Sequence, residues 1–278
     1  MKSCIHTNRL VVVWKLFYLI KIDLVMPSIK ALLKKTPIIN IYIILKRLFV
    51  GPTPQNDEAI ILDRLTKRYR IPNTFIEFGF SGWEFNCAKL VDSWSGLLID
   101  GDPYNIKIGR IILPKSVTVK REWLTLDNLD CIKSYARGKD IGILSIDLDG
   151  NDYWFWDKLI YLRPALLIAE YNSSFGLKSI TVPYDPLFDR RKKHKTWTYY
   201  GASLSAINHL AMKNGYSLIE VGNTGVNAFF IRNDYLTSDD LVLKPESAFR
   251  EYAFPDGARP SQQWENIKDM TYINIPEN

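Results

Sequence analysis

The stretch Phe75-Ile76-Glu77-Phe78-Gly79-Phe80-Ser81-Gly82 decides the fold class of this chain. A short apolar run holds one acidic residue and is followed by two glycines three positions apart, which is typical of a buried strand that ends in a tight turn. Glycines at such a turn let a ligand approach the backbone closely. A second run, Gly96-Leu97-Leu98-Ile99, ends in Asp100-Gly101-Asp102-Pro103. Together the two runs predict a βαβ unit that binds a nucleotide.

The same alternation of strands and helices continues along the chain. Further strands are predicted at 116–120, 141–146 and 165–169, and helices at 57–69, 83–94, 126–137, 152–161 and 203–214. Two more strands, 216–221 and 226–232, flank the turn sequence Gly222-Asn223-Thr224-Gly225 and predict a hairpin. The pattern predicts an α/β fold with a Rossmann-like seven-stranded sheet, helices on both faces and a terminal antiparallel hairpin.

The positive charge of the chain is concentrated near its beginning. Residues 1–56 contain nine basic residues and one acidic residue, whereas the other 222 residues contain 27 basic and 29 acidic ones. The net charges are therefore +8 and −2. We predict a basic, apolar helical arm with a linker at 1–56 and a folded domain at 57–278. Because the domain is nearly neutral, no nucleic-acid partner is expected.

Two interpretations of the arm stay open. Lysines interrupt its apolar runs, so none reaches the ~20 residues of a membrane-spanning helix. The arm then forms amphipathic helices that pack on the domain or on a second subunit, or residues 1–50 form an interfacial membrane contact. The three widely spaced cysteines indicate a reducing compartment. We therefore expect a cytoplasmic protein, at the inner face of a membrane if the second interpretation holds.

Acidic residues follow two of the predicted strands. Asp147 and Asp149 stand two positions apart after one strand, and Glu170 follows the next. Because the carboxyl ends of parallel strands meet at one edge of the sheet, these carboxylates should lie together and suit a hard divalent ion such as Mg²⁺. The alternative is a turn with a helix cap, for which Asn151 and Asp152 are suitable.

Four segments resemble the FkbM-like group of S-adenosylmethionine-dependent methyltransferases. They are Glu77–Gly82, Asp100–Pro103, Thr125-Leu126-Asp127-Asn128-Leu129 and Ile143-Leu144-Ser145-Ile146-Asp147-Leu148-Asp149-Gly150, within residues 74–232. Asp149 stands where glutamate is usual. The resemblance implies methylation of a hydroxyl on a saccharide, a glycan or a related small metabolite, as in polysaccharide biosynthesis.

The resemblance also implies which residues hold the donor: Glu77, Gly79, Ser81, Gly82, Asp100, Asp102 and Asp147. The glycine turn would line its methionine and ribose side. A carboxylate can accept both ribose hydroxyls, and of the two candidates after the second strand we expect Asp102 rather than Asp100 in this role.

A second, partial resemblance is to the metal-dependent sugar O-methyltransferases of macrolide and aminocoumarin pathways. It rests on Asp147-Leu148-Asp149 and Glu170-Tyr171-Asn172. It implies Asp147 and Glu170 as metal ligands, Asn172 as a third ligand and Asp149 as the general base.

A long segment, 171–200, is predicted to be a substrate lid because it lacks a regular pattern and is rich in aromatic and basic residues. His194 in this segment would be a base that the lid brings to the site, or part of a solvated basic run. Trp197, Tyr199 and Tyr200 would stack on sugar faces or pack the lid onto the domain.

Two rival functions were weighed. A nucleotide-cofactor enzyme of another reaction class would need a fuller glycine motif or a hydride-transfer apparatus, neither of which the sequence contains. A catalytically silent, membrane-associated binding protein would not need the paired acids.

Overall fold

The computed structural model describes residues 38–252 and 258–276, and the chain divides into two units between Gly51 and Pro52. In the first unit the described element is α3 (Ile38–Phe49), whose last turn carries Lys46 and Arg47. Residues 1–37 of the predicted arm lie outside the described residues. Among the helices described, none combines the length and apolarity needed to cross a bilayer.

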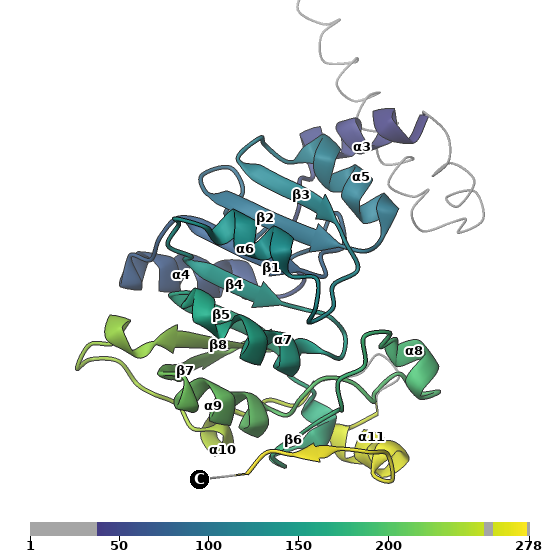
Figure 1. Cartoon of the computed structure of the whole chain (residues 1–278), viewed down its shortest axis with the longest axis vertical. Coiled ribbons are helices and arrows are strands. Elements are labelled where there is room, and N and C mark those ends of the chain that lie inside the picture. Colours follow the sequence, from purple (N-terminus) through teal and green to yellow (C-terminus); the bar gives the residue numbers. More distant parts are fainter. Residues whose placement is uncertain (1–37, 253–257, 277–278) are drawn as a thin grey trace, which may run out of the picture. The chain divides into compact units, whose positions relative to one another are not determined.

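The second unit is built on one seven-stranded sheet with the order β3-β2-β1-β4-β5-β8-β7 (Figure 1). The first five strands are parallel, and β8 is inserted antiparallel between β5 and β7. The strands are β1 (Thr74–Phe78), β2 (Ser95–Asp100), β3 (Val117–Arg121), β4 (Ile143–Ile146), β5 (Leu166–Glu170), β7 (Tyr216–Val221) and β8 (Asn227–Arg232). This confirms the predicted Rossmann-like seven-stranded sheet with its terminal antiparallel hairpin.

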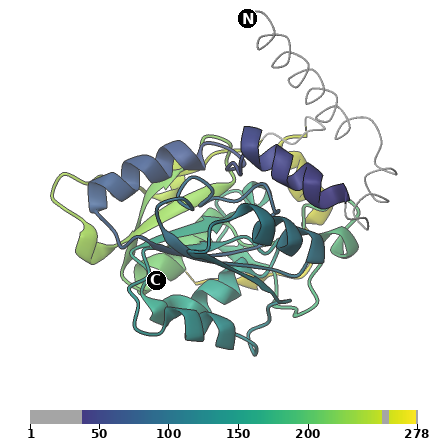
Figure 2. The ribbon, with the colours of Figure 1, turned by 90° about the horizontal axis from the view of Figure 1, so that it is seen from above.

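Helices cover both faces of this sheet (Figure 2). One apolar cluster joins the sheet to α6, α7 and α9, and a second joins its other face to α4, α5 and the segment after β1. The helices are α4 (Glu58–Tyr69), α5 (Pro103–Ile112), α6 (Asp130–Ala136), α7 (Asp152–Leu159) and α9 (Leu204–Lys213), with short 3₁₀ turns η1 (Ile160–Leu162) and η3 (Asn233–Tyr235). The central strands are buried on both faces, which explains their mostly apolar sequences.

The helix predicted at 83–94 is wrong. Glu84 instead forms an isolated bridge with Thr53, whose amide donates to the Trp83 carbonyl (2.9 Å) and whose carbonyl accepts from the Phe85 amide (3.2 Å). Successive turns follow, with Ala88 and Leu90 donating to carbonyls three positions earlier. Because the first part of the segment pairs with Thr53, no continuous helix forms.

The predicted lid folds together with the end of the chain. The lid contains η2 (Ser173–Phe175), β6 (Ile180–Thr181) and α8 (Arg190–Lys193). The part of the chain after β8 contains α10 (Pro245–Ala248), α11 (Pro260–Ile267) and β9 (Ile273–Asn274). Strands β6 and β9 pair antiparallel. An apolar cluster of Phe175, Phe188, Tyr199 and Ile267 joins the two segments. We call residues 172–200 and 260–275 the accessory lobe.

Candidate active site

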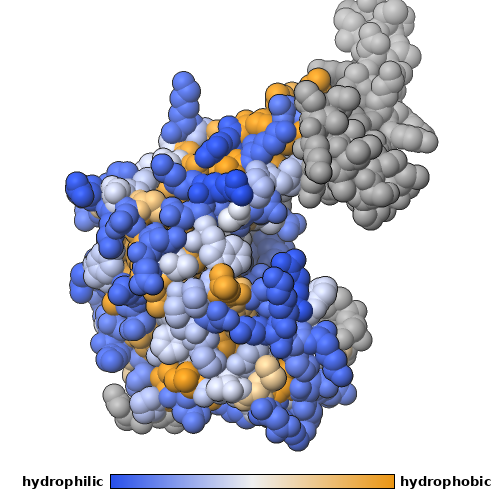
Figure 3. All heavy atoms as spheres, turned by 45° about the vertical axis from the view of Figure 1, so that its right-hand side comes forward, coloured by the Kyte–Doolittle hydropathy of each residue, from blue (hydrophilic) through white to orange (hydrophobic). Residues whose placement is uncertain are grey.

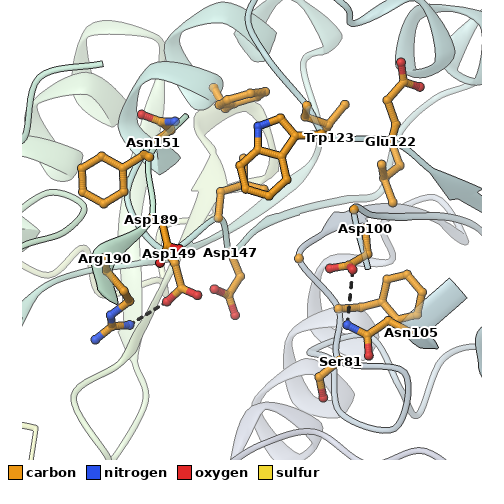
Figure 4. A pocket seen from close by; sticks show the side chains of 18 of the residues that line it. Ser81, Asp100, Asn105, Glu122, Trp123, Asp147, Asp149, Asn151, Asp189 and Arg190 are labelled. Carbon is orange, nitrogen blue, oxygen red and sulfur yellow. Dashed lines mark hydrogen bonds and ion pairs between the residues drawn. The ribbon is translucent and has the colours of Figure 1, made fainter. Parts of the chain in front are cut away.

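A cavity of about 510 Å³ lies at the carboxyl ends of β1, β2 and β4 (Figure 4). Asp100 and Asn105 line one side, Asp147 and Asp149 lie across from them, and the indole of Trp123 stands between the two groups. The accessory lobe contributes Phe188, Arg190 and Trp197 to the wall. The cavity therefore combines strand-end acids with side chains that arrive from a distant part of the sequence.

The glycine turn brings β1 against the end of β4. Gly79 has φ +77°, and a Cβ at this position would lie 1.5 Å from the carbonyl oxygen of Asp147. Only glycine allows this approach. Gly79 and the exposed Ser81, both predicted to hold the donor, line the cavity. Gly82, with φ +44°, lies outside the cavity lining and packs against the side chain of Ile108.

Glu77 lies beneath the site and does not line the cavity. Its buried carboxylate accepts hydrogen bonds from the backbone amides of Asn86 (2.6 Å) and Cys87 (2.9 Å). Burial raises the pKa of Glu77 to about 7, although both hydrogen bonds favour the ionised form. Glu77 therefore holds the segment after β1 in place. The expected direct contact of Glu77 with the methyl donor is not supported, because its side chain does not line the cavity.

Asp100, not Asp102, faces the cavity, so the preference stated above is corrected. Oδ1 of Asp100 accepts from the amide of Asp102 (2.6 Å) and from Nδ2 of Asn105 (3.3 Å), and burial raises its pKa. Asp102 is exposed, and its carboxylate caps α5 by accepting from the amides of Tyr104 (2.6 Å) and Asn105. The cap uses the side chain that we expected to bind the ribose.

Asp147, Asp149 and Glu170 form an acid cluster. Each offers a carboxylate oxygen, and these oxygens lie within 4.8 Å of one another. Asp149 has φ +53°, in the left-handed region that side chains rarely adopt. The buried carboxylate of Asp152 supports this turn by accepting from the amides of Leu148 (2.9 Å) and Gly150 (3.0 Å). The turn predicted as a helix cap thus serves to present Asp149.

The cluster favours a cation or bound protons. Burial, and then repulsion from neighbouring acids, raises the pKa values of Asp147 and Glu170 well above the usual range. Glu170 also has a buried carboxylate oxygen, Oε2, that has no hydrogen-bond partner among the described residues. Three oxygen donors with one buried and unsatisfied match the ligand type of a hard divalent ion such as Mg²⁺.

Arg190 supplies a positive charge next to the acid cluster. Its Nη1 donates to Oδ1 of Asp149 at 2.6 Å, and its Nε donates to the carbonyl of Trp197 at 2.8 Å. The guanidinium also lies 3.6 Å from the ring centroid of the buried Tyr200. Sequence reasoning missed this residue, since a basic run gives no indication of which member turns inward.

Two predicted site residues are not brought to the cluster. Asn172 is fully buried, with Nδ2 donating to the carbonyls of Thr198 and Tyr200 and Oδ1 accepting from the amide of Ser174, so the prediction of a third ligand there is wrong. His194 follows α8 outside the cavity lining, with Nδ1 2.8 Å from the Thr196 hydroxyl. Asp149 takes the third position in the cluster instead.

The aromatic residues of the predicted lid divide into two groups. Tyr199 and Tyr200 are buried and pack the lobe, whereas Trp197 lines the cavity with 55% of its surface exposed and φ +59°. Trp123, missed in the sequence, is 57% exposed and is held by a hydrogen bond from Nε1 to the Pro186 carbonyl (2.8 Å). Its position directly after a parallel strand was the available signal, because such residues reach the same edge of the sheet.

No protein-family profile and no curated protein matches this chain. Solved structures with a similar arrangement include the N-terminal domain of EvdMO1 with SAH bound, at 12% identity over 63% of this chain and 79% of that one, with a TM-score of 0.40. A candidate O-methyltransferase from Klebsiella pneumoniae is 15% identical over 74% and 94%, with a TM-score of 0.42. A candidate caffeoyl-CoA O-methyltransferase from Staphylococcus aureus is 12% identical over 73% and 96%, with a TM-score of 0.44. At these values no residue role is transferred to this chain.

Proposed function

We propose that this chain is an S-adenosylmethionine-dependent O-methyltransferase. The observation that carries the proposal is the position of the cavity. The strand order reverses between β1 and β4, and the cavity lies at the carboxyl ends of these two strands, with Asp100 from β2 beside them. In open α/β sheets ligands bind at this switch point. The antiparallel insertion of β8 agrees with the methyltransferase type of sheet.

The donor would bind along the strand ends. The hydrogen bonds that the Asp100 carboxylate accepts from described residues both go to Oδ1. Its Oδ2 is therefore open to a ribose hydroxyl. Gly79, Ser81 and Asp147 line the same cavity, and the methionine part would bind beside them. A cavity of about 510 Å³ falls in the range typical of small-molecule sites, which is about 300–1,000 Å³.

The residues of the acid cluster fit the acceptor side of the reaction. S-adenosylmethionine would supply an activated methyl group, so the chain has to orient the acceptor hydroxyl and remove one proton. Asp149 is placed to take that proton as the oxygen–carbon bond forms and the carbon–sulfur bond breaks, which leaves a neutral thioether and a methyl ether. The strained turn at Asp149 supports a functional role for this residue.

Asp147 and Glu170, with Asp149 at the third position, would hold a divalent ion such as Mg²⁺. The unsatisfied Oε2 of Glu170 supports this assignment. The ion would lower the pKa of a nearby acceptor hydroxyl.

We further propose that the acceptor is a saccharide, as the FkbM-like resemblance implies. The exposed indoles of Trp123 and Trp197 line the same cavity as the acid cluster and offer flat apolar surfaces to a sugar ring. A silent binding protein would gain nothing from the strained Asp149.

Calorimetry with S-adenosylhomocysteine tests the donor site. Asp100→Asn should weaken binding about 10- to 100-fold, because hydrogen bonds to a charged group contribute about 1.5–3 kcal/mol. Asp102→Asn is the matched control, since asparagine also caps helices, and its affinity should stay within about twofold. A flat trace with folded wild-type protein would remove the methyltransferase proposal, and equal effects of both variants would remove the role of Asp100.

A further inference from the structure

Arg190 reaches the acid cluster from the accessory lobe and is held in place by three contacts. These are the ion pair with Asp149 (2.6 Å), the hydrogen bond to the Trp197 carbonyl (2.8 Å) and the stacking on Tyr200 (3.6 Å). Its side chain is only 24% exposed. An arginine with both guanidinium edges and one face engaged is an ordered part of the site.

The neighbouring basic residues of α8 are paired elsewhere. Arg191 contacts Asp189 (3.0 Å), and Lys193 contacts Asp185 (2.7 Å). Arg190 is thus the basic residue of α8 that pairs with the acid cluster. Its guanidinium occupies Oδ1 of Asp149, one of the two oxygens through which this residue could join Asp147 and Glu170 around a cation.

We infer that Arg190 competes with a divalent cation for Asp149, and that it acts as a positioning residue which holds this carboxylate until a cation binds. The inference rests on the proposed metal site and deepens it. Two positive charges beside one carboxylate repel each other, so binding of the ion weakens the Arg190–Asp149 pair. The cost of that displacement lowers the affinity of the site for the ion.

The contacts of Arg190 also link the cluster to the wall of the cavity. The same guanidinium holds the carbonyl of Trp197, an exposed residue in a strained left-handed conformation. A shift of the guanidinium away from Asp149 would also disturb its hydrogen bond to this backbone. Cation binding would then be coupled to the position of Trp197.

Titration calorimetry of the full chain with Mn²⁺, and in parallel with Mg²⁺, tests the inference. Arg190→Met removes the charge at similar length, and the affinity for either ion should rise at least about tenfold. The matched control is Lys192→Met, which removes a charge from the same helix at an exposed side chain that lies outside the cavity lining and pairs with Asp189. Its affinity should stay within about twofold of wild type. An unchanged or weaker affinity of Arg190→Met would overturn the inference.

Stability gives a second readout. Without a cation, Arg190→Met should melt at a lower temperature than Lys192→Met, because the acid cluster then lacks the guanidinium that pairs with Asp149, and Mg²⁺ should remove the difference. If Arg190→Met does not fold with or without Mg²⁺, Arg190→Lys replaces it. That variant keeps the charge but loses the forked geometry, so it should bind Mn²⁺ between one- and tenfold more tightly than wild type, and weaker binding would refute the inference.

The outcomes separate this inference from the proposed function. S-adenosylhomocysteine binding is measured on the same samples. If wild type binds the donor product and Mn²⁺ but Arg190→Met gains nothing, only the inference fails. If wild type binds S-adenosylhomocysteine but no divalent ion, the metal site and the inference fail and the methyltransferase proposal stands. Loss of both binding reactions in folded wild type contradicts the proposed function itself.

Discussion

Glu77 occupies the acidic position of the glycine-turn motif, yet it supports the site from below. Its two hydrogen bonds fix the amides of Asn86 and Cys87, and the side chain of Asn86 continues to the Ser145 hydroxyl at 3.0 Å. This buried network connects β1, the segment after it and β4. A carboxylate is well suited here because each of its two oxygens accepts from one of the backbone amides. The side chain of glutamine has only one oxygen and could not accept in both positions.

Glu77 should make stability depend on pH. Its pKa is raised from 4.5 to about 7 in the folded chain, so the folded state binds more protons than the unfolded state between these values. The free energy of unfolding therefore falls as pH rises through this window, by up to about 1.4 kcal/mol per pH unit from this group. Glu77→Gln lacks this titration and should show a smaller loss between pH 5.0 and 7.5 in urea unfolding. The exposed Glu84→Gln is the control, and equal losses in all three proteins would contradict the assignment.

The sequence alone could have predicted that Asp100, rather than Asp102, faces the cavity. Pro103 is favoured at the first position of a helix, which places Asp102 at the N-cap, where its carboxylate serves the backbone. Asp100 is then the acid left at the end of β2. The position of Arg190 could not be predicted in this way, because its approach to Asp149 depends on how the accessory lobe folds.

Among the elements, the strands buried on both faces were predictable and the lobe was not. The runs at 143–146 and 166–170 are mostly apolar, with Ser145 and Glu170 as their polar residues, because helices cover both sides, and the hairpin carries its own turn signal. By contrast, β6 and β9 have two residues each, too few for any periodicity. Their pairing depends on packing between segments that lie far apart in sequence.

The lobe should unfold locally when its packing is weakened. Ile267 of α11 is fully buried against this lobe, and Ile267→Ala should cost about 2–5 kcal/mol of local stability. Hydrogen exchange should then accelerate at 172–200 while β1, β4 and β5 keep their protection. The exposed Glu265→Ala on the same helix is the control. Equal loss of protection in the central strands would mean that the lobe and the sheet unfold as one unit.

Packing between the lobe and the acid turn gives this local unfolding a functional consequence. Phe188 belongs to the apolar cluster of the lobe, and its ring lies so close to Gly150 that a Cβ there would be 2.2 Å away. Gly150 directly follows Asp149. The lobe thus contacts the acid cluster through both Phe188 and Arg190.

At the scale of the whole molecule, the charge is divided between the parts of the chain. Residues 1–56 carry a net +8 and the remainder −2. On the face shown in Figure 3, hydrophilic residues predominate on the second unit and hydrophobic ones are scattered among them. On this face they do not form the contiguous patch that a membrane-binding face needs. Because the excess of basic residues lies in 1–56, we propose that any contact with a membrane is made by the first unit.

Liposome flotation tests this proposal. The full chain should float with vesicles that contain about one third anionic lipid and should lose this binding in 1 M salt, because each basic residue near such a surface contributes about 1 kcal/mol and salt screens it. A chain that begins at Pro52 should stay in solution, and Lys34→Gln/Lys35→Gln in the full chain should bind more weakly. Flotation of the shortened chain would place the contact in the second unit. The alternative, in which the arm packs on a second subunit, predicts a different result. The full chain would then not bind vesicles and would sediment as a dimer, while the shortened chain would be a monomer.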